Sequence, residues 1–213
     1  MLSRLVRNRR GHADGRDGDA ERDETSAEEA PRVLTSWTQA LHIARDTQIR
    51  HDPTGPSRQK RAAKEQAARL IREYGTVRKG SRYLDLGGED WYDPFFDGFV
   101  LSVNLPDGDM HDLARYGGGW DCVLAMHSLE HSPAPLVVLL EAYDVLRPKG
   151  VLYVATPQPC QDFVNMESHW TVLHWQGWYR LIRAAGFDIL HVEKAVFGDY
   201  DDAIEDRFVC RRP

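Results

Sequence analysis

Residues 120–157 read WDCVLAMHSLEHSPAPLVVLLEAYDVLRPKGVLYVATP, and this stretch decides the fold class. The apolar run at 121–126 predicts a buried strand, 135–146 predicts a helix, and 151–155 predicts a second buried strand. Gly150 ends the helical stretch, as glycine commonly does after a helix. A strand, a helix and another strand in this order form the unit from which parallel sheets are built.

The same alternation of apolar runs and helical segments continues on both sides of this stretch. Strands are predicted at 82–86, 99–105, 188–196 and 206–210, and a further helix at 176–185. Strands that alternate with helices predict an α/β domain with a doubly wound, mainly parallel sheet. In such a sheet, ligands bind beyond the carboxyl ends of the strands.

The N-terminal part of the chain has a different composition. Residues 1–31 are nearly all charged or small, and such a stretch cannot bury enough apolar surface to offset its ordering entropy. We therefore expect a disordered tail at 1–31 and one domain at 32–213, whose helical N-terminal part covers 32–80. Apolar residues at helical spacing predict a first helix at 33–46.

A second helix that ends at Gly75 is predicted from one apolar stripe, formed by Ala63, Ala67, Leu70, Ile71 and Tyr74. Its other face, within 58–72, carries basic residues: Arg58, Lys60, Arg61, Lys64, Arg69 and Arg72. A solvated helix face and a nucleic-acid contact both fit this pattern, and we favour the solvated face.

The overall composition excludes several classes of protein. A net charge of -6 and a pI of about 5.8 argue that the chain as a whole is not a polyanion-binding protein. There is neither an apolar run long enough for a membrane helix nor an apolar signal region at the start. Cys122, Cys160 and Cys210 are too few and too widely spaced for a disulfide framework or a cysteine metal site. We expect reduced thiols in a cytoplasmic protein.

The end of the first predicted strand carries the first candidate ligand contacts. Gly87 and Gly88 let the backbone approach a ligand closely, because glycine has no Cβ. Asp85 would lie at the strand end, where a carboxylate can hold a ligand ammonium group or fix the turn. Alone, this pattern is a weak indication of function.

Together with YLDLGG (83–88), GDMHDL (108–113) and LIRAAGFDI (181–189), the quoted stretch resembles the class I S-adenosylmethionine-dependent methyltransferases. The pattern shared with that family is a strand with an aspartate and a glycine turn, an Asp-Leu pair, a strand followed by a Leu-Glu-His sequence, and a late Ala-Gly-Phe turn. The resemblance implies a Rossmann-like fold in which the last two strands form an antiparallel edge.

The resemblance also implies a cofactor cleft for S-adenosylmethionine. The implied contacts are Asp85, Gly87 and Gly88 at the methionine end, Asn104 at the ribose, Asp112 and Leu113 at the adenine, and His127 and Ser128 on the methyl-donor side. Asp112 could instead cap a turn, and Asn104 could be a loop residue without a ligand. His127 and His131 lie four residues apart, but no further ligand is nearby in sequence, so no metal site is predicted and His131 is expected to be structural.

Three departures from the family pattern favour an inactive relative. The later glycines of the turn are replaced by Glu89 and Trp91, and about ten residues that include Pro94 leave little room for the usual helix. Asn104 stands where the family usually has a carboxylate, so it would lose a charge-assisted bond to the ribose.

The implied methyl transfer requires little acid–base catalysis, because holding the acceptor close to an already activated methyl group supplies most of the rate enhancement. A general base is needed only if the acceptor loses a proton, and His127, His169 and His174 are the candidates, each with an ordinary pKa near neutrality. Aromatic residues at 157–178 predict either an acceptor pocket or a lid.

We therefore expect a methyltransferase that acts on a small-molecule acceptor. The alternative is a catalytically inactive binding or scaffold protein of the same fold. A nicotinamide enzyme is excluded because GGEDWYDP does not supply the glycine pattern that cradles a pyrophosphate. The sequence does not indicate an oligomeric state.

Overall fold

The computed structural model describes residues 58–75, 77–88, 95–104, 108–160, 164–196 and 204–213. All of them belong to one compact unit, Leu34–Pro213. The predicted tail at 1–31, the helix at 33–46, and the residues Glu89, Trp91 and Pro94 lie outside the described residues, so the expectations for them stay predictions.

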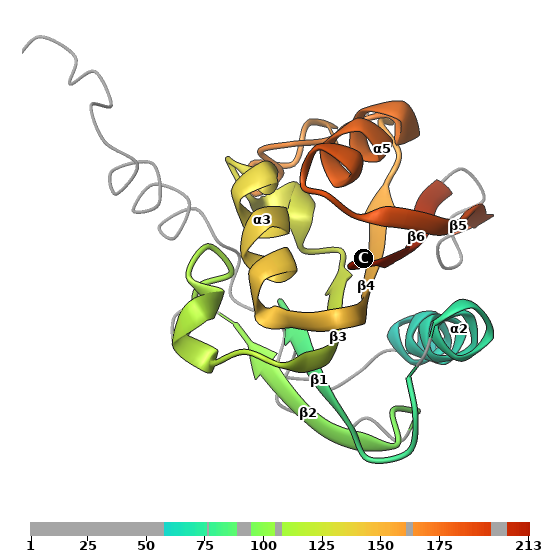
Figure 1. The fold of residues 1–213 in the computed structure, drawn as a ribbon. Helices are drawn as coiled ribbons and strands as arrows, with labels where there is room; N and C mark the ends of the chain where they lie inside the picture. Colours follow the sequence, from blue (N-terminus) through green and yellow to red (C-terminus); the bar gives the residue numbers. More distant parts are fainter. Residues whose placement is uncertain (1–57, 76, 89–94, 105–107, 161–163, 197–203) are drawn as a thin grey trace, which may run out of the picture. The chain divides into compact units, whose positions relative to one another are not determined.

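Six strands form one sheet in the order β2-β1-β3-β4-β6-β5 (Figure 1). Their bounds are β1 Ser81–Leu86, β2 Gly98–Val103, β3 Trp120–Met126, β4 Leu146–Pro157, β5 Asp188–Val196 and β6 Ile204–Arg211. The first four strands pair in parallel, and β6 pairs antiparallel with both β4 and β5. The predicted mainly parallel sheet with an antiparallel C-terminal edge is confirmed.

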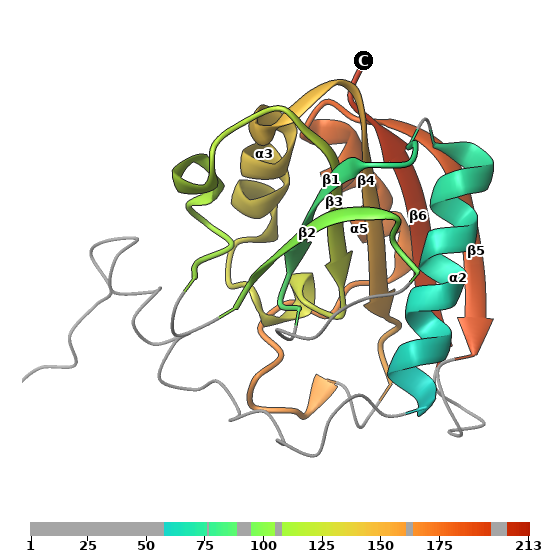
Figure 2. The same cartoon turned by 90° about the horizontal axis from the view of Figure 1, so that it is seen from below.

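Helices cover both faces of the sheet. Within the described ranges, the α-helices are α2 Arg58–Tyr74, α3 Pro135–Val145 and α5 Trp175–Ala184, and the 3-10 helices are η1 Leu113–Tyr116 and η2 Leu129–His131. Helix α2 runs along one face and contacts β4 and β6, whereas α3 and α5 pack together (Figure 2). The predicted doubly wound arrangement is confirmed.

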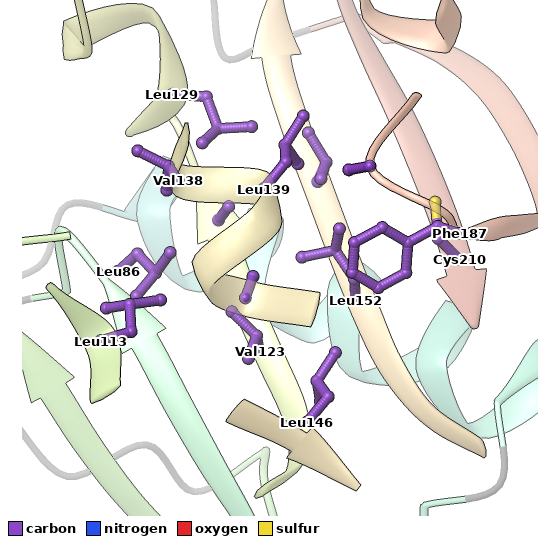
Figure 3. Packing of buried hydrophobic residues seen from close by; sticks show 14 of the residues in the cluster. Leu86, Leu113, Val123, Leu129, Val138, Leu139, Leu146, Leu152, Phe187 and Cys210 are labelled. Carbon is purple, nitrogen blue, oxygen red and sulfur yellow. The ribbon is translucent and has the colours of Figure 1, made fainter. Parts of the chain in front are cut away.

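Strands β1, β3, β4 and β6 contribute alternate residues to two separate cores. Val123 and Leu152 pack in the core beneath α3 and α5, whereas Leu124 and Tyr153 pack in the core beneath α2. This alternation follows from the two-residue repeat of a strand, and both faces are buried, as parallel sheets require. Figure 3 shows Leu139 of α3 among the residues of the first core.

The connection between β1 and β2 is unusually short for parallel strands, with nine residues between Gly88 and the start of β2 at Gly98. Phe96 in this connection is buried, and its ring centroid lies 5.0 Å from that of Tyr83. An aromatic side chain thus covers the part of the sheet beside β1.

Strand and helix boundaries differ from the predicted ones by a few residues. Strand β4 begins at Leu146, directly after α3, because the segment that follows the helix pairs with β3 and turns at Lys149, which has a φ of 64°. Strand β2 ends two residues earlier than predicted, and β6 is longer at both ends. Among the described residues, no helix combines the length and the apolar character needed to span a bilayer.

Candidate functional site

The carboxyl ends of three neighbouring parallel strands lie side by side. Leu86 at the end of β1 pairs with Val103 of β2 on one side and with Ala125 of β3 on the other. Gly87, Asn104 and His127 follow these strand ends, so the topology brings together the residues that the sequence placed at a cleft.

The turn after β1 needs glycine at Gly87, which has a φ of 75° and donates its N–H to the Val103 carbonyl at 2.7 Å. A Cβ on Gly87 would approach the Ser128 Cβ to 3.1 Å. A Cβ on Gly88 would lie 2.2 Å from Asp85 Oδ2, so the Asp85 carboxylate folds back over the turn. The predicted glycine turn is therefore tightly packed against both Asp85 and Ser128.

Asp85 forms a buried ion pair that the sequence did not predict. Its Oδ2 lies 3.2 Å from Lys64 Nζ, and the side chains of Lys64 and Asp85 are 11% and 3% exposed. The expectation that Lys64 lies on a solvated helix face is wrong. Lys64 precedes Ala67, Ala68 and Ile71 by three, four and seven residues, which places it on the buried face of α2.

The loop before η1 is fixed by a histidine bridge. His111 Nδ1 lies 2.8 Å from Asp109 Oδ1, and its Nε2 lies 2.7 Å from Ser132 Oγ. Asp112 follows as the N-cap residue of η1, but its exposed side chain makes no capping hydrogen bond. The alternative in which Asp112 caps the turn is therefore wrong.

Leu113 begins η1 directly after Asp112, and its expected contact with an adenine stays a prediction. Its side chain is fully buried in the core, and its N–H donates to Glu141 Oε2 at 3.0 Å. Ala114 donates to the same oxygen at 3.3 Å. A ligand would have to replace the bond to Glu141 in order to use the Leu113 N–H.

Asn104 directly follows β2 and is partly buried. Its backbone carbonyl accepts a hydrogen bond from the Gly108 N–H at 2.7 Å, which closes the loop after the strand. The Asn104 amide therefore sits at a defined strand end, and its role at a ribose stays a prediction.

His127 is held at the end of β3 by two buried carboxylates. Its Nε2 lies 2.6 Å from Glu205 Oε2 of β6, and its Nδ1 lies 3.4 Å from Glu130 Oε1 of η2. Its φ of 50° is uncommon for a residue with a side chain, and such conformations concentrate at functional sites.

The same carboxylates change the protonation of His127. Burial alone would lower the pKa of its imidazole, but the hydrogen bonds and charges of Glu130 and Glu205 raise the pKa to about 9. Burial alone would likewise raise the pKa of Glu205, but His127 and Arg207 lower it. The pKa of His127 is therefore not the ordinary value that was expected of a general base, and its role as a base stays a prediction.

The other two candidate bases lie in the segment between β4 and α5. His169 is partly buried, and its ring meets the ring of His131 edge-on at a centroid distance of 4.8 Å. His174 is exposed at the start of α5, and its Nδ1 contacts Gln176 Oε1. The structure brings His169, but not His174, into direct contact with the Leu-Glu-His sequence.

The aromatic residues of this segment divide into two groups. In α5, Trp178 is fully buried, and the partly buried Trp175 packs against the core beneath that helix. Nearer β4, Met166 and Trp170 are exposed. Phe163 lies outside the described residues. The group nearer β4 is therefore exposed, while the group in α5 belongs to the core.

The basic residues of α2 are partly engaged by their own surroundings. Arg69 pairs with Glu73 at 3.1 Å, and Arg72 donates to the Phe95 carbonyl at 3.1 Å. This pattern supports a solvated helix face more than a nucleic-acid contact.

Comparison with known proteins identifies one family. Residues 58–192 match the family model described as a methyltransferase domain. No curated protein matches the chain.

Solved structures share the fold at low sequence identity. A protein from Galdieria sulphuraria, provisionally assigned as a sarcosine dimethylglycine methyltransferase, aligns with a TM-score of 0.59 and 13% identity over 70% of this chain and 84% of its own. The 1,6-didemethyltoxoflavin-N1-methyltransferase of Burkholderia thailandensis aligns with a TM-score of 0.55 and 18% identity over 71% and 78%. A SAM-dependent methyltransferase from Archaeoglobus fulgidus aligns with a TM-score of 0.54 and 12% identity over 71% and 94%.

Proposed function

The chain belongs to the methyltransferase domain family, and from that premise we propose that it binds S-adenosylmethionine and transfers its methyl group to a small-molecule acceptor. The observation that carries the proposal is the Lys64–Asp85 pair beside the Gly87 turn, at the carboxyl end of β1.

The residues at this strand end fit an amino-acid group. S-adenosylmethionine ends in an ammonium and a carboxylate on one carbon, and Asp85 and Lys64 offer the opposite charges 3.2 Å apart. Ser128 Oγ is buried without a hydrogen-bond partner among the described residues, and the Cβ of the same residue packs close to Gly87. A buried hydroxyl without a partner is costly, so a ligand that bonds to it would be favoured.

The other end of the cofactor has two candidate contacts. Asp112 is exposed and makes no capping bond, so its carboxylate can accept from an adenine amine. Asn104 at the end of β2 can accept from a ribose hydroxyl. Leu113 would contribute through its backbone, which the hydrogen bond to Glu141 holds in place at the start of η1.

The charge at the end of β3 suits a cationic ligand. A network of ion pairs lies here, with two positive and three negative groups. His127 pairs with Glu130 and Glu205, and Arg207 pairs with Glu193 and Glu205. The net charge of this set is therefore negative, which favours a sulfonium cation nearby. When bound, the cofactor supplies a methyl group already activated for displacement, so the chain needs mainly to position the acceptor.

We place the acceptor beside Met166 and Trp170, which present exposed apolar surface after β4. Proteins of this fold include one named for action on sarcosine and dimethylglycine and one named for 1,6-didemethyltoxoflavin, and these names support a small acceptor. His169 is our candidate if the acceptor must lose a proton, because His127 is already protonated at neutral pH. The three free cysteines support a cytoplasmic location.

Calorimetric titration tests the proposal. We expect the protein to bind S-adenosylmethionine and S-adenosylhomocysteine, and Asp112→Ala to weaken both at least tenfold. Asp144→Ala is the matched control, because Asp144 is exposed on α3 near the opposite end of the sheet. Loss of affinity in both variants, or in neither, would contradict the proposed adenine contact.

The alternative is an inactive binding protein, and one observation favours it. Lys64 already pairs with Asp85 within the fold, so the ammonium group of a ligand would have to compete with Lys64 for this carboxylate. Failure of a folded wild-type protein to bind either ligand would support this alternative.

A further inference from the structure

We propose that Glu130, His131 and His169 form a binding site for a divalent transition-metal cation of the zinc type. The carboxylate and the two imidazoles each offer one ligand atom, and these atoms lie within 4.8 Å of one another. The sequence argued against a metal at His131 because no further ligand lies nearby in the chain. The fold supplies that ligand from the segment after β4.

The carboxylate of Glu130 is the strongest indication of a missing partner. Its side chain is 1% exposed, and its Oε2 accepts no hydrogen bond from a residue that the structure describes. Its contact with His127 Nδ1 is long, at 3.4 Å. A buried carboxylate with one long ion pair at Oε1 and no partner at Oε2 is incompletely compensated, and a second cation would offset the remaining cost.

His131 is oriented as metal-binding histidines usually are. Its Nδ1 lies 2.9 Å from the Ser168 carbonyl, which can only accept, so Nδ1 carries the proton and Nε2 keeps its lone pair. The neighbouring residue His169 brings the second imidazole, edge-on to the first at 4.8 Å.

The segment that carries His169 is already attached to η2 by its backbone. The N–H groups of Trp170 and Thr171 both donate to the Glu130 carbonyl, at 2.8 and 3.0 Å. Thr171 Oγ1 donates to the Ser132 carbonyl at 2.9 Å. These bonds hold the three ligands near one another before a metal binds.

Two imidazoles and one carboxylate form a nitrogen-rich set that suits zinc and its neighbours better than magnesium or calcium. Ligand atoms about 2.0–2.1 Å from a tetrahedral zinc lie roughly 3.3 Å apart, so the site must contract by up to about 1.5 Å on binding. A rotation of the partly buried His169 side chain can supply this movement. Bound metal would tie the segment Val164–His174 to η2.

Zinc titration of the chelator-treated full chain tests the site without any cofactor. We expect one zinc per chain, binding that persists in excess magnesium, and at least a tenfold loss of affinity in both His169→Ala and Glu130→Gln. His174→Ala is the matched control, since His174 is an exposed histidine in the same segment and lies outside the cluster. It should bind zinc like the wild type.

A second readout separates a metal ligand from a residue needed only for folding. Zinc should slow proteolysis within 164–174 in the wild type and in His174→Ala, but not in His169→Ala, whose metal-free circular dichroism should match the wild type. Wild-type affinity in His169→Ala and Glu130→Gln, or the absence of stoichiometric zinc, would overturn the proposal. Neither result tests the proposed cofactor contacts at Lys64 and Asp85, because the titration contains no cofactor. Zinc binding would, however, remove His169 as a candidate base, since a metal-bound nitrogen has no lone pair left to accept a proton.

Discussion

Lys64 Nζ lies 3.2 Å from Asp85 Oδ2, and this contact joins the buried face of α2 to the end of β1. The connection after Gly88 is short, so little chain is available there for a helix whose N-terminus could attract a carboxylate. Lys64 supplies a positive charge at this place from a different part of the sequence. The pair thus links the helix before the sheet to the proposed cofactor site.

Replacing Lys64 should affect both stability and binding. Lys64→Met removes the positive charge that pairs with the buried Asp85 carboxylate, which is expected to cost ~3–5 kcal/mol of unfolding free energy. Urea denaturation measures this cost, and calorimetry should show at least a tenfold loss of affinity for S-adenosylhomocysteine. Arg61→Met, at an exposed position of the same helix, should change neither quantity appreciably.

A double variant separates the two effects. Lys64→Met combined with Asp85→Asn removes both charges, so much of the lost stability should return while the binding stays weak. Recovery of binding along with stability would mean that the pair only maintains the fold.

The glycine turn should tolerate no side chain. Gly87→Ala combines a φ of 75° with a 3.1 Å approach to the Ser128 Cβ, so it should lose cofactor affinity as well as stability. Gly80→Ala is a close control, because Gly80 has a φ of 77° but no atom within 4 Å of its Cβ position. It should cost ~1–2 kcal/mol of stability through backbone strain and leave binding intact. Equal losses of binding in the two variants would argue against a ligand at Gly87.

The raised pKa of His127 predicts a stability that declines on the alkaline side. The pKa rises from 6.5 to about 9 on folding, so the stabilisation is complete below pH 6.5 and is lost as the pH rises through 9. One pKa unit corresponds to about 1.36 kcal/mol, so the total is roughly 3 kcal/mol. Glu205 has a lowered pKa and acts in the opposite direction, losing its contribution as the pH falls below 4.5.

Denaturation of metal-free protein between pH 6 and 10 measures this decline. The charged groups around the imidazole are Glu130, Glu205 and Arg207, the last of which pairs with Glu205. His127→Gln should remove most of the fall in stability at alkaline pH. An NMR titration midpoint of the His127 ring near 6.5 would show that the carboxylates do not hold its proton.

Phe96 should stabilise the sheet beside β1. Phe96→Ala removes a ring that is 4% exposed and packs on Tyr83, with an expected cost of ~3–5 kcal/mol. Phe99→Ala, at a side chain that is 56% exposed, should cost at most about 1 kcal/mol. Similar losses in chemical denaturation would show that Phe96 does not cover the sheet.

Apolar patterning predicted most of the fold, because every predicted strand and helix among the described residues is present. The two-residue alternation that separates Val123 from Leu124 and Leu152 from Tyr153 accounts for a sheet buried on both faces. Patterning could not fix the boundary at Leu146, because strand β4 extends through a polar turn that pairs with β3 only in the tertiary structure.

The site was less predictable, since its key contacts join residues far apart in the chain. The spacing of Lys64 from Ile71 was a usable signal, because seven residues place both on one helix face. Nothing local marks Glu205 as the partner of His127, which lies 78 residues away. Glu130, three residues away, and the distant Glu205 together raise the pKa of His127, and the sequence shows only the first of these two partners.

A crystal structure of the chain with S-adenosylhomocysteine tests the central claim most directly. We predict that the ammonium of the ligand bonds to Asp85, its carboxylate lies at Lys64, and its adenine lies beside Asp112. A ligand bound elsewhere, or crystals that stay free of ligand at saturating concentration with the Lys64–Asp85 contact unchanged, would contradict the claim that this strand end holds the cofactor.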